Sequence, residues 1–281
     1  MVDLTPKLKA DLHIHTNFSD GAHSPAEIIQ FASTKGLDLI SITDHDTIAG
    51  LELALELNRD NAIEIINGVE LSTYLDGVEI HLLGYLFDLN NQNFLELLKT
   101  LYDGRLNRAK RICKRLEILG VELTIEEVLE ISGISAVGRP HIAAALVKKG
   151  YAENIYKAFD KYLMQNSPFY VPKENLNVFD AIKAVHDAGG LTFTAHPGNI
   201  TEHTLIKLVR GGLDGIEVIH PSLKAHQTRE LKKFVKTYNL LESGGSDFHG
   251  GTRNDQKNFG VYHISPSHVE KMKEFLASKN N

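Results

Sequence analysis

The chain has 281 residues and a formal net charge of −6, because 36 acidic residues outnumber 30 lysines and arginines. Hydrophobic residues make up 42% and charged residues 23%, a balance typical of a folded globular protein and unlike that of a disordered one. The acidic balance argues against binding duplex DNA through a broad basic surface. The sequence contains neither a run of about 18 apolar residues nor a signal peptide, so we expect a cytoplasmic protein with no membrane association.

Histidine is unusually frequent, with 14 residues, whereas there is only one cysteine, Cys113. Imidazole is the side chain that both binds metals and transfers protons near neutral pH. A single cysteine excludes an internal disulfide and any zinc site built from several thiolates. A metal centre in this chain would therefore use His, Asp and Glu.

Strand and helix patterns alternate in the first third of the chain. Residues 9–15 alternate in polarity and predict a strand. Ser24-Pro25-Ala26-Glu27 has the pattern of a helix start, with Ser24 and Glu27 as a capping box, and the helix should stop at Gly36. A strand is expected next at 37–43, followed by a helix at 47–59 and a strand at 62–72. The turn Asp76-Gly77 then leads to a strand at 78–87. This alternation predicts a parallel α/β sheet or barrel, and Asp46 is a candidate N-cap for the second helix.

Residues 93–160 show only helical periodicity. Strands follow at 191–195, 215–219 and 240–244, with helices at 179–188, 201–210 and 223–238. We therefore expect a barrel formed by 1–92 and 172–281, interrupted by a helical insertion at 93–171 that helps to cover the active site. The insertion contains a basic run, which we interpret as a solvated helix face, with a surface for phosphate or RNA as the alternative; the run comprises Arg105, Arg108, Lys110, Arg111, Lys114 and Arg115.

Candidate metal ligands lie near six predicted strands. His13 and His15 are two residues apart on the first strand, so both side chains point to the same face. The other candidates are Asp20, His45, Glu70, His81, His196, Asp247 and His249. In β/α barrels the carboxyl ends of the strands meet at one mouth, where we expect these side chains to converge.

Nine ligands exceed the needs of one or two ions, and three divalent ions fit if Glu70 bridges two of them. Nitrogen and oxygen ligands without thiolate suit manganese, iron or zinc, and magnesium least. Asp11 and Asp44 lie beside the histidines and are expected to accept hydrogen bonds that fix imidazole tautomers.

The motifs resemble the PHP (polymerase and histidinol phosphatase) superfamily. The resemblance is carried by DLHIHTNFSDG at 11–21, ITDHDT at 42–47, GVE at 68–70, AHP at 195–197 and GGSDFHG at 244–250. The length, the insertion and GRPHIA at 138–143 resemble its stand-alone phosphoesterase branch, which includes 3′,5′-nucleoside bisphosphate phosphatases and 5′→3′ exoribonucleases. The resemblance implies a distorted seven-stranded (β/α) barrel with three metal ions, for which we expect manganese.

The same resemblance implies which residues hold each ion. His13, His15, Glu70 and Asp247 would hold the first; Glu70, His81 and His196 the second; and Asp20, His45 and His249 the third. Family members commonly have an aromatic residue where this chain has His220. We therefore expect His220 to be a surface or capping residue, with weak binding of the substrate as the alternative.

Clustered cations lower the pKa of bound water, so the expected nucleophile is a metal-bound hydroxide. Arg139 is the candidate for holding the substrate phosphate, with His141 as a hydrogen-bond donor or leaving-group acid. The alternative is that Gly138-Arg139-Pro140 merely starts a helix.

We expect a phosphoesterase that removes the 3′-phosphate of 3′,5′-bisphosphonucleotides, with stepwise 5′→3′ hydrolysis of short RNA as an extension. A histidinol-phosphate phosphatase or another small phosphomonoesterase is the first alternative. A non-catalytic module supporting a polymerase is the second, and the complete ligand set argues against it.

Overall fold

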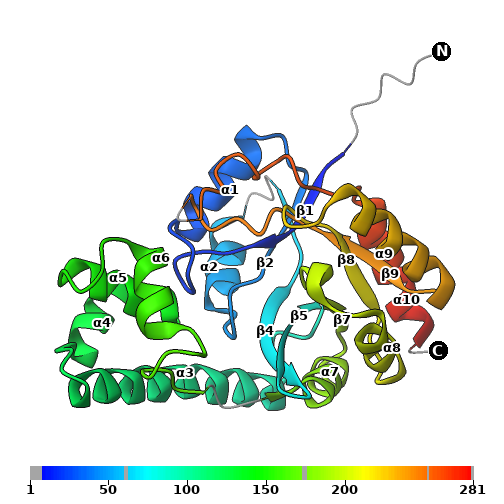
Figure 1. Cartoon of the computed structure of the whole chain (residues 1–281). Helices are drawn as coiled ribbons and strands as arrows, with labels where there is room; N and C mark the ends of the chain where they lie inside the picture. The colour runs from blue at the N-terminus through cyan, green and yellow to red at the C-terminus, as the bar shows by residue number, and fades with distance from the viewer. Residues whose placement is uncertain (1–7, 60–62, 173–175, 252, 280–281) are drawn as a thin grey trace.

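The computed structural model describes residues 8–59, 63–172, 176–251 and 253–279. Its strands form two sheets (Figure 1). The first is parallel, with the order β1 (Ala10–Ile14), β2 (Leu39–Ile42) and β3 (Glu64–Ile65). The second has the order β6-β4-β5-β7-β8-β9, formed by Leu176–Asn177, Gly68–Leu75, Val78–Tyr85, Leu191–Thr194, Gly215–Ile219 and Leu241–Gly244.

Isolated backbone bridges join the two sheets into a distorted (β/α) barrel. His45, just beyond β2, pairs with Glu70 on β4, and Ile14 on β1 pairs with Phe248, beyond β9. The strands with four or more residues are β1, β2, β4, β5, β7, β8 and β9, seven in the described chain. Because single bridges replace continuous ladders at both junctions, the barrel is distorted, as the sequence led us to expect.

The direction of β5 differs from the expected parallel arrangement. It runs antiparallel to both β4 and β7. The connection from β4 is the two-residue turn Asp76-Gly77, with φ of 51° and 80°, and turns of this kind join antiparallel neighbours. As a result His81, near the start of β5, pairs with Ser72 and lies one residue from Leu82, which pairs with Thr194 at the end of β7.

The single strand predicted at 62–72 is wrong, because the described part of this range forms two strands in different sheets. β3 ends at Ile65 and β4 begins at Gly68; residue 62 lies outside the described ranges. Gly68 passes so close to β2 that a Cβ atom there would lie 2.0 Å from the Ser41 hydroxyl oxygen. Glu70 is consequently the third residue of β4 rather than the last of a strand.

Below the mouth, the barrel interior is apolar. His81, Leu83 and Tyr85 alternate along β5, so they share one face. Leu83 and Tyr85 are fully buried with Leu12 and Phe193. The Tyr85 hydroxyl donates to the Leu12 carbonyl oxygen at 2.8 Å and lies 3.0 Å from the Ser243 hydroxyl. This one side chain therefore links β5 to both β1 and β9.

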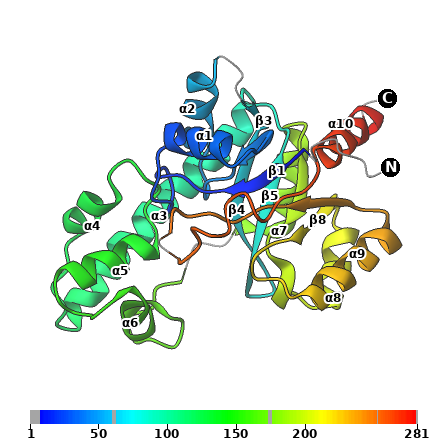
Figure 2. The same ribbon diagram turned by 90° about the horizontal axis from the view of Figure 1, so that it is seen from above.

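Helices surround the strands (Figures 1 and 2). They are α1 (Pro25–Thr34), α2 (Ala49–Leu57), α7 (Val178–Asp187), α8 (Glu202–Arg210), α9 (Ala225–Tyr238) and α10 (Ser267–Lys279), with a 3-10 turn at Pro197–Asn199. The capping box of Ser24 and Glu27 is confirmed. Asp46 is not the N-cap of α2, because that helix begins three residues later with Ile48 in the N-cap position. Instead, the buried Asp46 carboxylate accepts from the Ser72 backbone N–H and the Arg105 guanidinium.

The chain between β5 and β6 is helical, as expected. It contains α3 (Gln92–Ile118), α4 (Ile125–Ser132), α5 (Arg139–Lys148), α6 (Ile155–Ala158) and a π-helical turn (Phe159–Leu163). These helices bury a cluster of their own that includes Leu116, Val128, Ile142, Leu146 and Tyr162. Figures 1 and 2 show α4, α5 and α6 set to one side of the barrel. Within the described ranges, no helix is both long and apolar enough to cross a bilayer.

The basic run on α3 forms a solvated face in part, as expected, although its arginines also bind the protein itself. Arg108, Arg111 and Arg115 donate to backbone carbonyls of Val171, Pro172 and Pro168. Arg105 contacts Asp46 and donates to the Ser72 hydroxyl at 3.1 Å. Lys110, Arg111, Lys114 and Arg115 are exposed and match the expectation, whereas Arg105 and Arg108 are half-buried. The arginines fix the segment that returns from the helices to the barrel.

Candidate metal centre

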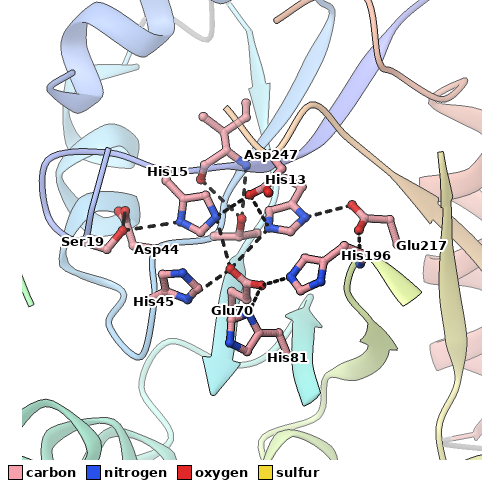
Figure 3. Close-up of polar contacts among 12 residues, drawn as sticks. His13, His15, Ser19, Asp44, His45, Glu70, His81, His196, Glu217 and Asp247 are labelled. Atoms are coloured by element: carbon pink, nitrogen blue, oxygen red, sulfur yellow. Dashed lines mark hydrogen bonds and ion pairs between the residues drawn. The ribbon is translucent and has the colours of Figure 1, made fainter. Parts of the chain in front are cut away.

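The structure brings the nine predicted ligands together at the mouth of the barrel, and Figure 3 labels seven of them, all except Asp20 and His249. They come from elements far apart in the sequence: β1 and the turn after it, the segments after β2, β7 and β9, and the interior of β4 and β5. The residues are His13, His15, Asp20, His45, Glu70, His81, His196, Asp247 and His249, which approach one another through the contacts described next.

A first group of ligand atoms lies at the end of β1. The Nε2 atoms of His13 and His15 lie 3.4 and 3.2 Å from Glu70 Oε2. The same two nitrogens lie 3.3 and 3.1 Å from Asp247 Oδ1. Two nitrogens and two carboxylate oxygens at these separations can bind one cation between them.

The second oxygen of Glu70 faces a different group. Oε1 lies 2.9 Å from His81 Nδ1 and 3.1 Å from His196 Nε2. Glu70 is only 1% exposed, and its two oxygens contact different sets of imidazoles, as Figure 3 shows. This carboxylate is therefore placed to bridge two cations.

A third group surrounds Asp20. Its Oδ1 atom lies 3.3 Å from His249 Nε2 and 3.9 Å from His45 Nε2. The other nitrogen of His45 lies 3.1 Å from Glu70 Oε2, so His45 connects this group with the first.

The ligand atoms have the properties of a metal site. His13 Nε2, His15 Nε2 and Asp20 Oδ1 are buried and make no hydrogen bond with any described residue. Buried polar atoms in this state are costly unless something else satisfies them. His196 and Asp247 also have left-handed backbones, with φ of 32° and 48°; such strain is typical of functional sites. A cluster of divalent ions fits these donors.

The carboxylates and imidazoles perturb one another strongly. Burial alone would raise the pKa of the Glu70 and Asp20 carboxyls, but the surrounding imidazoles hold both well below the ordinary value. Conversely, burial alone would lower the pKa of His15 and His81. Carboxylates, Glu70 among them, outweigh burial and raise the pKa of each to about 9. Without metal, the cluster is thus a network of ion pairs in which protons occupy the positions that cations would take.

Glu217 is a functional residue that our sequence reasoning missed. It is fully buried on β8, and its Oε1 accepts from His13 Nδ1 at 2.9 Å. Its Oε2 accepts from the His196 backbone N–H at 2.6 Å. The bond to Nδ1 leaves the Nε2 lone pair of His13 free for a cation. The available signal was one acidic residue in the otherwise apolar strand GIEVI.

Neither Asp11 nor Asp44 accepts a hydrogen bond from an imidazole ring of the described residues, so neither fixes a tautomer directly. Asp11 accepts from the backbone N–H groups of His13 and Ser246, at 3.3 and 2.9 Å. Asp44 accepts from Thr16 and from the Ser19 hydroxyl. Because the Ser19 oxygen lies 3.5 Å from His15 Nδ1, Asp44 reaches that ring only through Ser19. Both carboxylates mainly hold the backbone around the ligands.

Two residues beyond β9 also support the centre, and nothing in the sequence motifs identified them. Arg253 pairs with Asp20 Oδ2 at 2.5 Å. Asp255 accepts from the backbone N–H groups of His249 and Gly251. The loop after β9 is thereby tied to one ligand through its side chain and to another through its backbone.

The predicted substrate residues Arg139 and His141 lie in the first turn of α5, so the helix start expected as an alternative exists as well. The Gly138 N–H donates to His141 Nδ1 at 3.0 Å, which leaves Nε2 as the protonated nitrogen of the neutral ring. Burial lowers the pKa of His141. Arg139 lies 3.6 Å from Glu79 Oε2, and Glu79 Oε1 lies 3.5 Å from His81 Nε2. The Glu79 carboxylate thus lies between Arg139 and the predicted ligand His81.

His220 does not lie on the surface. Its side chain is only 5% exposed, and Nε2 lies 3.2 Å from Asp247 Oδ2. It does not cap the following helix, whose N-cap is Lys224, but its Nδ1 accepts from the Ser222 N–H at 3.1 Å in the turn before that helix.

Comparisons with known proteins identify the family. The family model described as "PHP domain" matches residues 11–173. A 5′-3′ exoribonuclease of Haemophilus influenzae is 35% identical, over 86% of this chain and 90% of its own. A 3′,5′-nucleoside bisphosphate phosphatase of Chromobacterium violaceum is 31% identical, over 85% and 86%. The crystal structure of a putative metal-dependent phosphoesterase from Bifidobacterium adolescentis superposes with a TM-score of 0.86 at 30% identity, covering 95% of this chain and 96% of that one.

We predict that Glu217→Gln weakens metal binding by about 10- to 100-fold. The amide no longer holds the proton on Nδ1 of His13, so it no longer keeps the Nε2 lone pair of that ring available for a cation. Titration of the metal-free protein with Mn²⁺ or Zn²⁺ measures this. Glu242→Gln is the matched control, since Glu242 lies on the neighbouring strand β9 and contacts His268. Equal affinities for the two variants would contradict the role of Glu217.

Metal binding should also depend on pH. His15 and His81, whose pKa values are raised to about 9, carry protons in the metal-free protein at neutral pH. An entering cation must displace those protons, so the apparent metal affinity should increase as the pH rises from about 6.5 towards 9. Calorimetry in two buffers of different ionisation enthalpy measures the protons released. Binding without proton release would show that these imidazoles are already neutral.

Proposed function

The chain belongs to the PHP domain family, and we propose that it is a metal-dependent phosphoesterase that removes the 3′-phosphate of 3′,5′-bisphosphonucleotides. The observation that carries this proposal is the division of nine ligands into three groups around the bridging carboxylate of Glu70. Such a centre can bind the several oxygens of a phosphate ester at once. The similarity to a 3′,5′-nucleoside bisphosphate phosphatase supports the choice of substrate.

In this proposal three divalent ions, with manganese as the expected metal, are held by the three groups. His13, His15, Glu70 and Asp247 hold the first, Glu70, His81 and His196 the second, and Asp20, His45 and His249 the third. When bound there, the ions would supply positive charge for the phosphoryl oxygens and would lower the pKa of a bound water.

Two residues on α5 complete the proposed substrate site. The Arg139 guanidinium can exchange its 3.6 Å contact with Glu79 for two parallel hydrogen bonds to a phosphate. His141 presents an Nε2–H donor, because Nδ1 is occupied by the Gly138 N–H. That donor can bind a phosphoryl oxygen, or it can give its proton to the leaving-group oxygen.

We further propose that residues 93–171 are an insertion covering the metal centre. Support comes from contacts between this segment and the barrel mouth. The Ala136 N–H donates to the Phe18 carbonyl oxygen at 2.8 Å, and the Ser135 hydroxyl donates to the Asn17 carbonyl oxygen at 2.6 Å. Both acceptors lie in the turn between the ligands His15 and Asp20.

A short RNA end is the second candidate substrate, since 5′-3′ exoribonucleases are also similar to this chain over most of its length.

A parallel assay with Mn²⁺ tests the substrate. We expect faster phosphate release from adenosine 3′,5′-bisphosphate than from histidinol phosphate, with nucleotide release from a 5′-phosphorylated RNA oligomer as the further activity. A chelator or His13→Ala should abolish turnover, because the metal is then lost. Preference for histidinol phosphate would overturn the substrate assignment, whereas activity that survives chelation would overturn the mechanism.

Arg139→Ala should raise the KM for the bisphosphonucleotide by about 10- to 100-fold, the effect of losing hydrogen bonds to a charged group. The metal content should not change, because Arg139 contacts no ligand directly. Lys148→Ala, an exposed change in the last turn of the same helix, is the control. Loss of metal from Arg139→Ala would show that the arginine supports the centre through Glu79 and His81 instead.

A further inference from the structure

His220 lies beside the metal centre without belonging to the nine ligands. It is the first residue after β8, and its ring centre lies 5.9 Å from that of His13 and 5.5 Å from that of His196. With 5% of its side chain exposed, it is buried between these ligands and Asp247. Its two ring nitrogens have different surroundings, and these determine what the residue can do.

The Nδ1 atom of His220 faces Ser222. The Ser222 backbone N–H donates to Nδ1 at 3.1 Å, and the Ser222 hydroxyl oxygen lies 2.8 Å from the same atom. A backbone N–H can only donate, so Nδ1 must offer its lone pair. In the neutral ring the proton is therefore on Nε2.

The Nε2 atom points into the site and makes no hydrogen bond with the described residues. Asp247 Oδ2 lies 3.2 Å away, but the contact lacks hydrogen-bond geometry. Since Nε2 carries a proton, it has no lone pair for a cation, which distinguishes His220 from His13 and His196. A buried N–H whose neighbouring carboxylate is poorly aligned gains from a better-placed acceptor, which a ligand can supply.

We propose that His220 is a further substrate-binding residue, whose Nε2–H donates to an oxygen of the phosphate group held at the metal centre. This inference rests on the proposed phosphoesterase function and adds a contact on the β8 side of the mouth. Arg139 and His141 come from α5, so the phosphate is bound by donors from two separate parts of the chain.

Two substitutions separate the two nitrogens of the ring. His220→Asn places an oxygen near the position of Nδ1, so it keeps the acceptor for the Ser222 N–H and removes the donor into the site. His220→Gln places an amide N–H near the position of Nε2 and keeps that donor. His226→Asn, an exposed change on α9, is the control.

For each metal-loaded variant, the measurements are metal content, melting temperature and the dissociation constant for inorganic phosphate. We expect His220→Asn to keep its metal and melting temperature and to bind phosphate about 10- to 100-fold more weakly. His220→Gln should bind phosphate within a few-fold of the unmodified protein.

Two results would overturn the proposal. Unchanged phosphate affinity in His220→Asn would show that Nε2 does not contact the anion, and loss of one metal equivalent would show that His220 is a ligand. Phosphate binding is measured without turnover, so this test stays separate from the substrate assay. Weakened phosphate binding in a protein that does not hydrolyse bisphosphonucleotides would support His220 while overturning the proposed function.

Discussion

The carboxylate of Glu70 is the group on which the rest of the site depends. It is almost completely buried, and five imidazoles, those of His13, His15, His45, His81 and His196, lie within 3.4 Å of its two oxygens. An isolated carboxylate would not remain ionised in such a place, because the loss of hydration is too costly. The positive charge that stabilises it must come from protons on the imidazoles or from cations bound between them. Burial of Glu70 thus requires positive charge at this place, whether from protons or from cations.

Five imidazoles surround one carboxylate because one strand of the barrel, β5, runs against the parallel direction of a β/α barrel. A wholly parallel barrel would present only residues near the carboxyl ends of its strands at the mouth. The β4–β5 hairpin reverses direction at Asp76-Gly77 and places His81 opposite Ser72, two residues along β4 from Glu70, so that its Nδ1 reaches Glu70 Oε1. Gly68 allows β4 to pass close to β2, and the His45–Glu70 bridge connects the two sheets at that level. The distortion of the barrel and the assembly of the centre therefore have the same structural origin.

Motifs close together in the sequence identified the side chains that the structure brings together, whereas partners distant in the sequence were not predictable. H-x-H on one strand, and His or Asp near other strands, identify themselves by residue type and position, and the Ser24 capping box is equally local. Glu217 was missed because its partner His13 is 204 positions away. The contacts of the α3 arginines were not predicted for the same reason, since Arg108, Arg111 and Arg115 donate to carbonyls of residues 168–172. Helical periodicity shows which face is polar, but it does not show that a returning segment contacts that face.

Strand β8 shows how a strand that supplies no predicted ligand can still determine the chemistry of the mouth. Glu217 accepts the Nδ1 proton of His13, which leaves the Nε2 lone pair of that ring directed at a cation. Ser222, three residues beyond the strand, donates to Nδ1 of His220 and so leaves a proton on Nε2. The two imidazoles are close neighbours, yet their site-facing nitrogens have opposite character. A centre that binds cations and a phosphate together needs both kinds, and for His13 and His220 the hydrogen-bond partner of Nδ1 decides which kind the ring provides.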